Sequence, residues 1–570
     1  MPPDSRLLFG QASSEAEQAE FFDRVREGFL SASSRTGEVL RDYCVAGIPV
    51  RLRFAGDALM APLLPALANP QPAAAVAPKY EICLWDSEST GVSMTPCPRS
   101  HKDFTACGNI WGFDSPRYRS AYQWSENSLS AMDRETGSAV FWLPRPDRLP
   151  TWTLAAPLRT LLHWIMELNG RQLVHAAAIG AGDNGALLVG RSGAGKSSTA
   201  LACLEHGLDF LSDDYLAVAL DPEPVAYRLF NTAKVDPGAL HLYPGTAQSS
   251  RVVMAPDCEK AVFFLDPARL RNCLPIRQTL KPRVAGAPDT SFGPAAAREI
   301  EHALAGEMLT HLPHAGAHTL DFLERMSLQL PASTVHAGTD RARLASAIRS
   351  ALGHAPAHRV NALPAAPPAI SMVVYCRDDD RAALRALAES IAAQDYRRAE
   401  LMAIAEGEAV RMEDEVARLP GNVRFSRCDR PANKPAAWNR GVRETLGELL
   451  LFIEMEDRLG CGALAAFAAA SQHDPDSSVF RAEVQFHSPE ESLRRPLAGA
   501  LIRRDAFRKH GLFDARLASA GSTEREWLAR TAANINACPA ILFRAGPAPA
   551  APRVDLAAIK QQLDRQRQRP

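Results

Sequence analysis

Residues 187–216 read LLVGRSGAGKSSTALACLEHGLDFLSDDYL, and the fold around them follows from this stretch. The pattern G-x-x-x-x-G-K-[ST] is met by Gly190, Gly195, Lys196 and Ser197. An apolar run, ALLV, comes directly before the pattern, and helix-forming residues follow it as far as Gly207. A strand, a glycine-rich loop and a helix in this order predict the phosphate-binding loop of an α/β domain.

The residue types in this loop suit a nucleotide. A glycine-rich backbone can turn consecutive N–H groups toward phosphate oxygens, and the helix that follows adds its positive end. We expect Lys196 to neutralise the β- and γ-phosphates of ATP, and the Ser197 hydroxyl to bind Mg²⁺. A chance match in a glycine- and alanine-rich chain is the alternative, and the flanking strand and helix argue against it. The predicted nucleotide-binding residues are Gly190, Ser192, Gly193, Ala194, Gly195, Lys196, Ser197 and Ser198.

Two adjacent carboxylates, Asp213 and Asp214, follow the next apolar run, DFLS. One of them could hold magnesium, directly or through water, and the other could accept a proton from an attacking hydroxyl. Alternatively, the pair is a solvated turn. His175 lies in QLVHAAAIG, which reads as a strand joined to ALLVG by a hairpin, and a lone histidine beside alanines is commonly a core residue. Upstream, the apolar spacing predicts a helix over about 155–168 that stops at Gly170.

In order and spacing, His175, the hairpin, GRSGAGKSS and the SDD that ends at Asp214 resemble the catalytic core of the HPr kinase/phosphorylases. The resemblance covers about residues 150–350 and is closest between 172 and 220. It implies a P-loop serine kinase related to phosphoenolpyruvate carboxykinase. By this match Asp213 is the base, His175 sits beside that base, Lys196 is catalytic, and Ser197 and Asp214 lie by the metal.

Downstream of Asp214 this chain differs from the family, because it lacks the family's apolar-Glu-apolar-Arg-Gly run. The chain looks more like the divergent HPr-kinase-like proteins of bacterial peptide-tailoring clusters, which include kinases of a serine in a lasso-peptide precursor. HPr is then not the expected substrate. Lys234 and Arg283 are candidates for phosphate or acceptor contacts, with solvated surface residues as the alternative.

Residues 370–545 resemble a family 2 glycosyltransferase of GT-A fold, a Rossmann-like α/β sandwich that binds a nucleotide sugar with Mn²⁺ or Mg²⁺. The resemblance is carried by a strand-helix opening with Ser390 and Gln394, by AWNRG around Asn439, by the strand LLLFI, and by GLFD before an acidic helix.

Several functional positions of that family are changed in this chain. Glu454-Met455-Glu456, followed by Asp457, stands where the family has Asp-x-Asp, and longer side chains fit octahedral coordination poorly. Of the acidic residues with which the family binds the nucleoside, only Glu406 is present in this chain. The catalytic base that the family would have near the acidic helix is expected at Glu524 or Glu526. From the sequence, this region is either an active glycosyltransferase or a degenerate module that is retained for substrate binding or architecture.

The length predicts several domains, and the motifs and resemblances above imply that they are of α/β class. The expected parts are an α+β region (1–135), an HPr-kinase/PEPCK-like P-loop domain (136–353), an Ala/Pro linker (354–369), a GT-A-like domain (370–547) and a polar tail (548–570). The net charge of -1 predicts no nucleic-acid partner, and no apolar run is long enough for a signal peptide or membrane span, so we expect a cytoplasmic protein. The 11 cysteines lack metal-site spacing.

Three hypotheses follow. The first is an ATP- and Mg²⁺-dependent serine kinase acting on a peptide or small protein. The second is a glycosyltransferase with a nucleotide-sensing P-loop domain. The third is an ATP-dependent scaffold without catalysis. A homo-oligomer is compatible with each of them.

Overall fold

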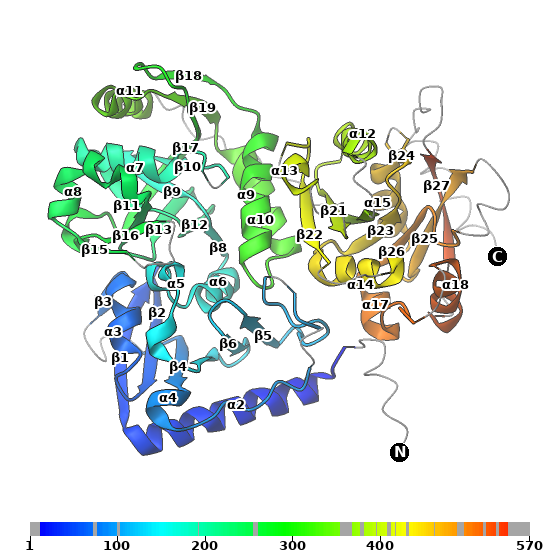
Figure 1. Ribbon diagram of the computed structural model, residues 1–570, viewed down its shortest axis with the longest axis horizontal. Coiled ribbons are helices and arrows are strands. Elements are labelled where there is room, and N and C mark those ends of the chain that lie inside the picture. Colours follow the sequence, from blue (N-terminus) through cyan, green and yellow to red (C-terminus); the bar gives the residue numbers. More distant parts are fainter. Residues whose placement is uncertain are drawn as a thin grey trace. The chain divides into compact units, whose positions relative to one another are not determined.

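The computed structural model of the chain describes residues 12–71, 77–99, 103–105, 107–191, 193–254, 260–353, 367–376, 381–394, 396–406, 412–416, 418–428, 433–460, 462–486, 495–516, 520–531 and 535–544. The chain divides into two compact units (Figure 1). One unit is Ser13–Leu363, and the other is Pro364–Pro570 together with Met1–Ala12. The P-loop region and the region before it therefore share one unit.

The first sheet of unit Ser13–Leu363 has seven strands in the order β3-β1-β2-β4-β7-β6-β5. Its strands are β1 (Glu38–Val45), β2 (Ile48–Ala55), β3 (Pro70–Gln71), β4 (Tyr80–Asp86), β5 (Tyr118–Gln123), β6 (Ser128–Asp133) and β7 (Ser138–Leu143). Because β7 pairs with both β4 and β6, this sheet extends past the boundary that we expected at residue 135.

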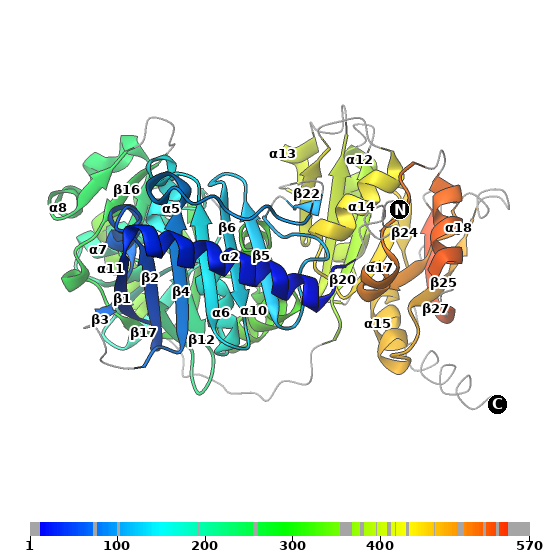
Figure 2. The same cartoon turned by 90° about the horizontal axis from the view of Figure 1, so that it is seen from below.

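Helix α2 (Glu15–Thr36) lies across one face of this sheet (Figure 2). Ser14 starts the helix with a capping box, since its hydroxyl accepts from the Glu17 N–H while the Glu17 carboxylate accepts from the Ser14 N–H. Phe21, Phe22 and Phe29 are buried against the sheet.

The second sheet of the same unit positions the glycine-rich loop at residues 190–195. Its order is β11-β9-β10-β17-β13-β12-β8, with β19 paired to β17 and β18 to β19. Its strands are β8 (Arg171–Val174), β9 (Ala177–Ala181), β10 (Asn184–Leu188), β11 (Asp209–Ser212), β12 (Leu216–Ala219), β13 (Val225–Arg228), β17 (Cys273–Val284), β18 (Ser291–Pro294) and β19 (Ala332–Ala337). Hairpin β9-β10 is antiparallel, as its turn GDNG predicts, whereas β10 and β17 are parallel.

Helices and a small third sheet complete this unit. The sheet has the order β14-β16-β15, from β14 (Thr232–Val235), β15 (Arg251–Val253) and β16 (Ala261–Phe264). The helices are α3 (Met60–Leu63), α4 (Ser87–Thr90), α5 (Thr151–Ala155), α6 (Arg159–Leu168), α7 (Lys196–Glu205), α8 (Pro244–Gln248), α9 (Ala297–His311), α10 (Ala317–Gln329) and α11 (Arg341–Gly353). Figure 1 shows α9 and α10 side by side.

Two local predictions change in the structure. The helix expected over about 155–168 begins only at Arg159, because Pro157 cannot continue a helix from α5. The strand expected across QLVHAAAIG is broken at His175 into β8, which pairs with β12, and β9, which pairs with β10 and β11. The break places His175 between two parts of the sheet rather than within a strand.

The other unit contains an eight-stranded sheet in the order β22-β21-β20-β23-β26-β25-β27-β24. The four strands β22, β21, β20 and β23 are parallel, and β26 joins them antiparallel. The strands are β20 (Ile370–Cys376), β21 (Ala399–Ala405), β22 (Val423–Arg427), β23 (Leu449–Ile453), β24 (Asp457–Leu459), β25 (Val479–Gln485), β26 (Ala500–Arg503) and β27 (Ile535–Arg544).

The helices of this unit are α12 (Arg381–Ala392), α13 (Glu413–Val416), α14 (Lys434–Glu444), α15 (Ala463–His473), α17 (Arg504–His510) and α18 (Ala520–Thr531). Apolar residues of α12 and α15 pack with strands β20, β21 and β23 in one core. The chain is thus an α/β multidomain protein with mixed sheets. Within the described residues, no helix is both long and apolar enough to span a bilayer.

Candidate active site

The glycine-rich loop connects β10 to α7 in the way that its sequence predicts. Gly193 and Gly195 have φ of +80° and +95°, a backbone conformation that side chains with a Cβ rarely adopt. Helix α7 then begins directly at Lys196. At its end, Gly207 has φ +75° and its N–H is bonded to Leu204 O, so the predicted stop is confirmed. Ser192, predicted to bind nucleotide, lies outside the described residues.

Lys196 folds back over its own loop. Its Nζ donates to Gly190 O at 2.6 Å and to Arg191 O at 3.3 Å. Burial lowers the pKa of Lys196, while Glu307 and Asp213 act in the opposite direction. The two loop carbonyls thus hold the ammonium group against the glycine-rich loop.

Asp213, which directly follows β11, is hydrogen-bonded to helix α7. The Ser197 hydroxyl donates to Asp213 Oδ1 at 3.0 Å, and the Lys234 N–H donates to Asp213 Oδ2 at 3.0 Å. Asp213 is buried, and both burial and the neighbouring Asp214 carboxylate raise its pKa. Although β11 pairs with β9 and not with the P-loop strand β10, the turn after β11 still reaches Ser197.

Asp214 points to a different set of partners. Its Oδ1 lies 3.0 Å from His175 Nε2, and its Oδ2 accepts from Lys234 Nζ at 2.6 Å. Burial acts to raise the pKa of Asp214, but Lys234 and His175 hold it well below its ordinary value. Asp214 has φ 72°, a strained value for a residue other than glycine.

The contacts of the predicted site residues therefore differ from those that the resemblance implied. His175 contacts Asp214, whereas the resemblance implied a place beside Asp213. Ser197, the expected metal ligand, contacts Asp213, whereas the resemblance put Asp214 by the metal. Lys234 does reach the site, and Arg283 lies 4.0 Å from Glu299 with most of its side chain exposed.

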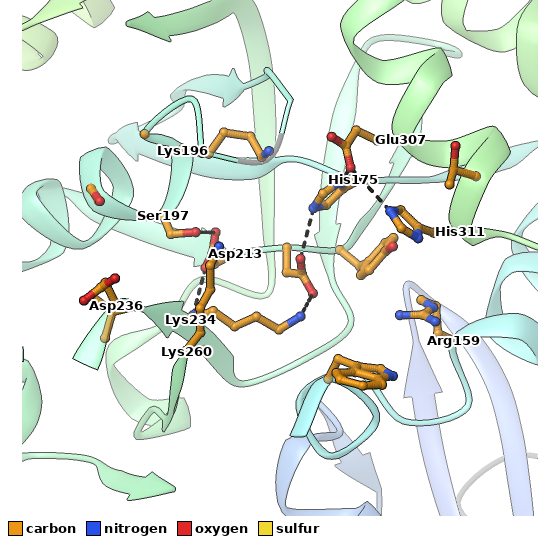
Figure 3. A pocket seen from close by; sticks show the side chains of 18 of the residues that line it. Arg159, His175, Lys196, Ser197, Asp213, Lys234, Asp236, Lys260, Glu307 and His311 are labelled. Atoms are coloured by element: carbon orange, nitrogen blue, oxygen red, sulfur yellow. Dashed lines mark hydrogen bonds and ion pairs between the residues drawn. The ribbon is translucent and has the colours of Figure 1, made fainter. Parts of the chain in front are cut away.

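A cavity of about 660 Å³ opens over these groups (Figure 3). Helix α9 contributes Glu307, whose carboxylate lies 3.3 Å from His175 Nδ1 and 3.6 Å from His311 Nε2. Burial acts to lower the pKa of His175, but Asp214 and Glu307 raise it above its ordinary value. Glu307 could not be predicted, because nothing in the spacing of residues 297–311 indicates which carboxylate would meet His175.

The residues at the start of α7 fit a magnesium ion. Mg²⁺ prefers oxygen ligands and commonly takes one or two from the protein and the rest from phosphates and water. Ser197 Oγ is such a ligand, and it lies 3.0 Å from Asp213 Oδ1. In the described ranges, no cluster of three or more His, Cys, Asp or Glu side chains forms a complete metal cage. The donor set thus suits an ion that arrives with a nucleotide.

The acidic segment after β23 is neutralised by basic side chains. Lys434 Nζ lies 2.6 Å and Arg495 Nε 3.0 Å from Glu454 Oε1. The same Arg495 donates to both oxygens of Asp457. A divalent cation would have to displace an ammonium and a guanidinium group here, so these residues do not fit the Mn²⁺ or Mg²⁺ of the expected glycosyltransferase site.

The other predicted residues of this unit lie around the same sheet. The Asn439 amide exchanges two hydrogen bonds with the backbone of Phe513, so it fixes the GLFD turn. Glu406 accepts from the Tyr375 hydroxyl. Glu456 is partly exposed beside the paired acids. Glu524 is buried and accepts from the Leu497 N–H at 2.7 Å.

Glu524 makes the stability of this unit depend on pH. Burial raises its pKa from 4.5 to about 7, with Lys434 and the Leu497 N–H opposing the shift. Between these two pH values the folded unit keeps a proton that the unfolded chain has released. Stability is therefore fully present below about pH 4.5 and falls as the pH rises through about 7, by at most about 3 kcal/mol.

We expect Glu524→Gln to remove this dependence and to stabilise the unit at pH 8 by about 1 to 3 kcal/mol, because the amide stays neutral and can still accept from Leu497. Urea denaturation read by protease susceptibility of the unit, at pH 5 and pH 8, measures it. Glu526→Gln is the control, because Glu526 lies two residues away on α18 and pairs with Arg530. Equal pH dependence in parent and Glu524→Gln would contradict the expectation.

No protein-family model matches the chain, and no curated protein matches it. Among solved structures it is similar to S. aureus TarS, with 15% identity over 31% of this chain and 37% of that chain, at a TM-score of 0.27. Similar too are S. aureus TarS 1-349 in complex with UDP-GlcNAc (14% identity, 32% of this chain, 59% of that chain, TM-score 0.27) and the mannosyltransferase PcManGT from Pyrobaculum calidifontis in complex with GDP-Man and Mn2+ (15%, 32%, 58%, TM-score 0.26). The chain thus spans less than two thirds of the length of these proteins.

Proposed function

We propose that unit Ser13–Leu363 is an ATP-dependent, HPr-kinase-like P-loop kinase that phosphorylates a serine of a peptide or small protein. The observation that supports this most is the 3.0 Å hydrogen bond from Ser197 Oγ to Asp213 Oδ1. It joins the start of the P-loop helix to a buried carboxylate, inside one cavity that also contains Lys196. A ribosomal peptide precursor of the lasso type is the acceptor that the resemblance favours.

Asp213 is the better base of the two aspartates. Its carboxylate accepts from the Ser197 hydroxyl and the Lys234 backbone N–H, and its pKa is raised, so it binds a proton readily. Asp214 is instead ion-paired with Lys234 and His175, and its pKa is low. Asp214 therefore stays charged and is held in place by Lys234 and His175.

In the proposed reaction, the γ-phosphoryl group of ATP moves to the acceptor serine. The serine hydroxyl of the acceptor gives its proton to Asp213, and its oxygen forms a bond to the γ-phosphorus of ATP. The bond from that phosphorus to the bridging oxygen breaks, and the electron pair leaves with ADP. Lys196 would turn from its loop carbonyls to the phosphate oxygens and neutralise the charge that moves onto the leaving group. When bound, Mg²⁺ would neutralise oxygens of the β- and γ-phosphates.

Two measurements on the whole protein test the proposal: a titration of ATP binding in the presence of Mg²⁺, and incorporation of labelled γ-phosphate into serine-bearing peptides. The kinase requires both binding and incorporation. Binding without any incorporation would favour the scaffold hypothesis, since a switch depends on nucleotide occupancy alone. Absence of ATP binding would overturn the P-loop assignment itself.

For the other unit, we propose a GT-A-like module that no longer transfers sugar with the help of a metal ion. The ion pairs of Lys434 and Arg495 with Glu454 and Asp457 support this, because they occupy the carboxylates that would bind the ion. A nucleotide-sugar-dependent glycosyltransferase with a nucleotide-sensing P-loop unit remains the alternative function.

A screen of UDP- and GDP-sugars with Mn²⁺ separates these two proposals for the module. We expect no metal-dependent transfer or hydrolysis above that of the protein-free control, and the same result for Glu456→Ala. Robust transfer that needs Mn²⁺ and disappears in Glu456→Ala would show that the module is an active glycosyltransferase.

A further inference from the structure

The cavity over the P-loop has a second end, remote from Lys196. Figure 3 shows Arg159 on the far side of His175 from Lys196, and His311 also lies at this end. Trp152, with 40% of its surface exposed, and Gln123 line the cavity as well. The proposed phosphate transfer gives these four side chains no role.

Arg159 has no carboxylate partner within ion-pair distance in the described part of the chain. Its guanidinium carbon lies 5.2 Å from the centre of the Tyr215 ring, and the guanidinium group is hydrogen-bonded to the Tyr215 side chain. Arg159 also lines the cavity, so the remaining N–H groups of its guanidinium can be offered to an anionic ligand there.

The acids whose charge reaches Arg159 are engaged elsewhere. Asp214 is bonded to Lys234 and His175. Glu126 accepts from the Thr153 hydroxyl at 2.6 Å and from the Ser128 hydroxyl at 3.0 Å. Because these carboxylates already have donors, the charge of Arg159 is left available to a ligand.

We infer that Arg159 binds a carboxylate of the acceptor, at the end of the cavity opposite the phosphate loop. This rests on the proposed kinase function and adds the class of acceptor to it: a hydroxyl compound with an acidic group close to the hydroxyl. A planar guanidinium fork matches a carboxylate in two parallel hydrogen bonds.

A carboxylate suits this end better than a phosphate group does. The Lys, Arg, Asp and Glu side chains that line the cavity are four cations (Arg159, Lys196, Lys234, Lys260) and four anions (Asp213, Asp214, Asp236, Glu307), and His175, whose pKa is raised, adds a positive charge when it is protonated. Bound ATP already adds negative charge, and a second phosphate group would add up to two more beside Asp214 and Glu307, whereas a carboxylate adds one. The Trp152 ring offers an apolar surface for the backbone of a short peptide.

Three serine peptides test the inference on the full-length protein, titrated with ADP and Mg²⁺ present. The first is blocked at both ends and flanked by alanines, the second carries an aspartate after the serine, and the third has a free carboxyl terminus. We expect one or both acidic peptides to bind about 10- to 100-fold more tightly than the blocked one. Which of the two is preferred distinguishes a side-chain carboxylate from a chain end.

We expect Arg159→Gln to abolish this preference and leave ADP affinity unchanged, which also shows that the variant folds. Arg159→Lys should retain part of it. Arg277→Gln is the matched control, because Arg277 pairs with Glu223 and is absent from the cavity wall. A preference that persists in Arg159→Gln, or no preference in the parent protein, would overturn the inference. Because these are binding measurements, an Arg159-dependent preference without phosphate incorporation would refute the kinase and leave the carboxylate site standing.

Discussion

The Asp213→Asn protein is expected to bind ATP as well as the parent does and to transfer phosphate about 10²- to 10⁴-fold more slowly, a loss of roughly 3 to 5 kcal/mol in the barrier. The amide has nearly the size of the carboxylate. Its oxygen can still accept from the Lys234 N–H, and its NH₂ group can donate to Ser197 Oγ. It cannot take a proton from the acceptor hydroxyl, so the loss should fall on transfer alone.

The measurement is phosphate incorporation beside an ATP titration, with Asp209→Asn as the matched control. Asp209 begins the same strand, and its carboxylate accepts from the Gly182 N–H, far along β11 from Asp213. If Asp213→Asn phosphorylates as fast as the parent, Asp213 is not the base. The raised pKa of Asp213 also predicts that transfer is slow at low pH and rises as Asp213 loses its proton.

The Lys196→Ala protein is expected to lose both functions. Hydrogen bonds to a charged group contribute about 1.5 to 3 kcal/mol each, so ATP should bind about 10- to 100-fold more weakly. Loss of a positioned cationic donor should slow any residual transfer by about 10²- to 10³-fold. The fold should survive, because the ammonium is bonded only to carbonyls of its own loop.

Lys79→Ala serves as the control for this variant, since Lys79 donates to Asn169 Oδ1 and does not line the cavity. Unchanged ATP affinity together with unchanged transfer in Lys196→Ala would mean that the loop does not bind the nucleotide. The two variants also separate two roles, because Lys196 should affect binding and transfer together and Asp213 transfer only.

The sequence was sufficient wherever the deciding interactions are local. The loop from Gly190 to Lys196 needs a strand before it, a helix after it and glycines at positive φ, and all three can be read within a few residues. The hairpin over GDNG and the helix end at Gly207 are local in the same sense. The parallel strands of the other unit follow from alternating strand and helix patterns.

Long-range packing decided the partners within each site. Whether Asp213 or Asp214 would face Ser197 depends on the backbone turn after β11, where Asp214 adopts φ 72°, and no sequence pattern specifies that turn. Glu307 and Arg159 come from helices far from the P-loop in sequence, and they meet His175 and Tyr215 only once the helices pack beside the sheet.

In the other unit, the sequence showed acids after β23 but not the basic side chains that neutralise them. Lys434 begins α14 and is separated from Glu454 by that helix and β23, and Arg495 follows Glu454 after β24, α15 and β25. Residue type alone therefore established which groups could bind phosphate, metal or a proton. Only the tertiary structure determined which of them are already paired and which remain available to a ligand, because ion pairing depends on distances of a few ångström between segments that are remote along the chain.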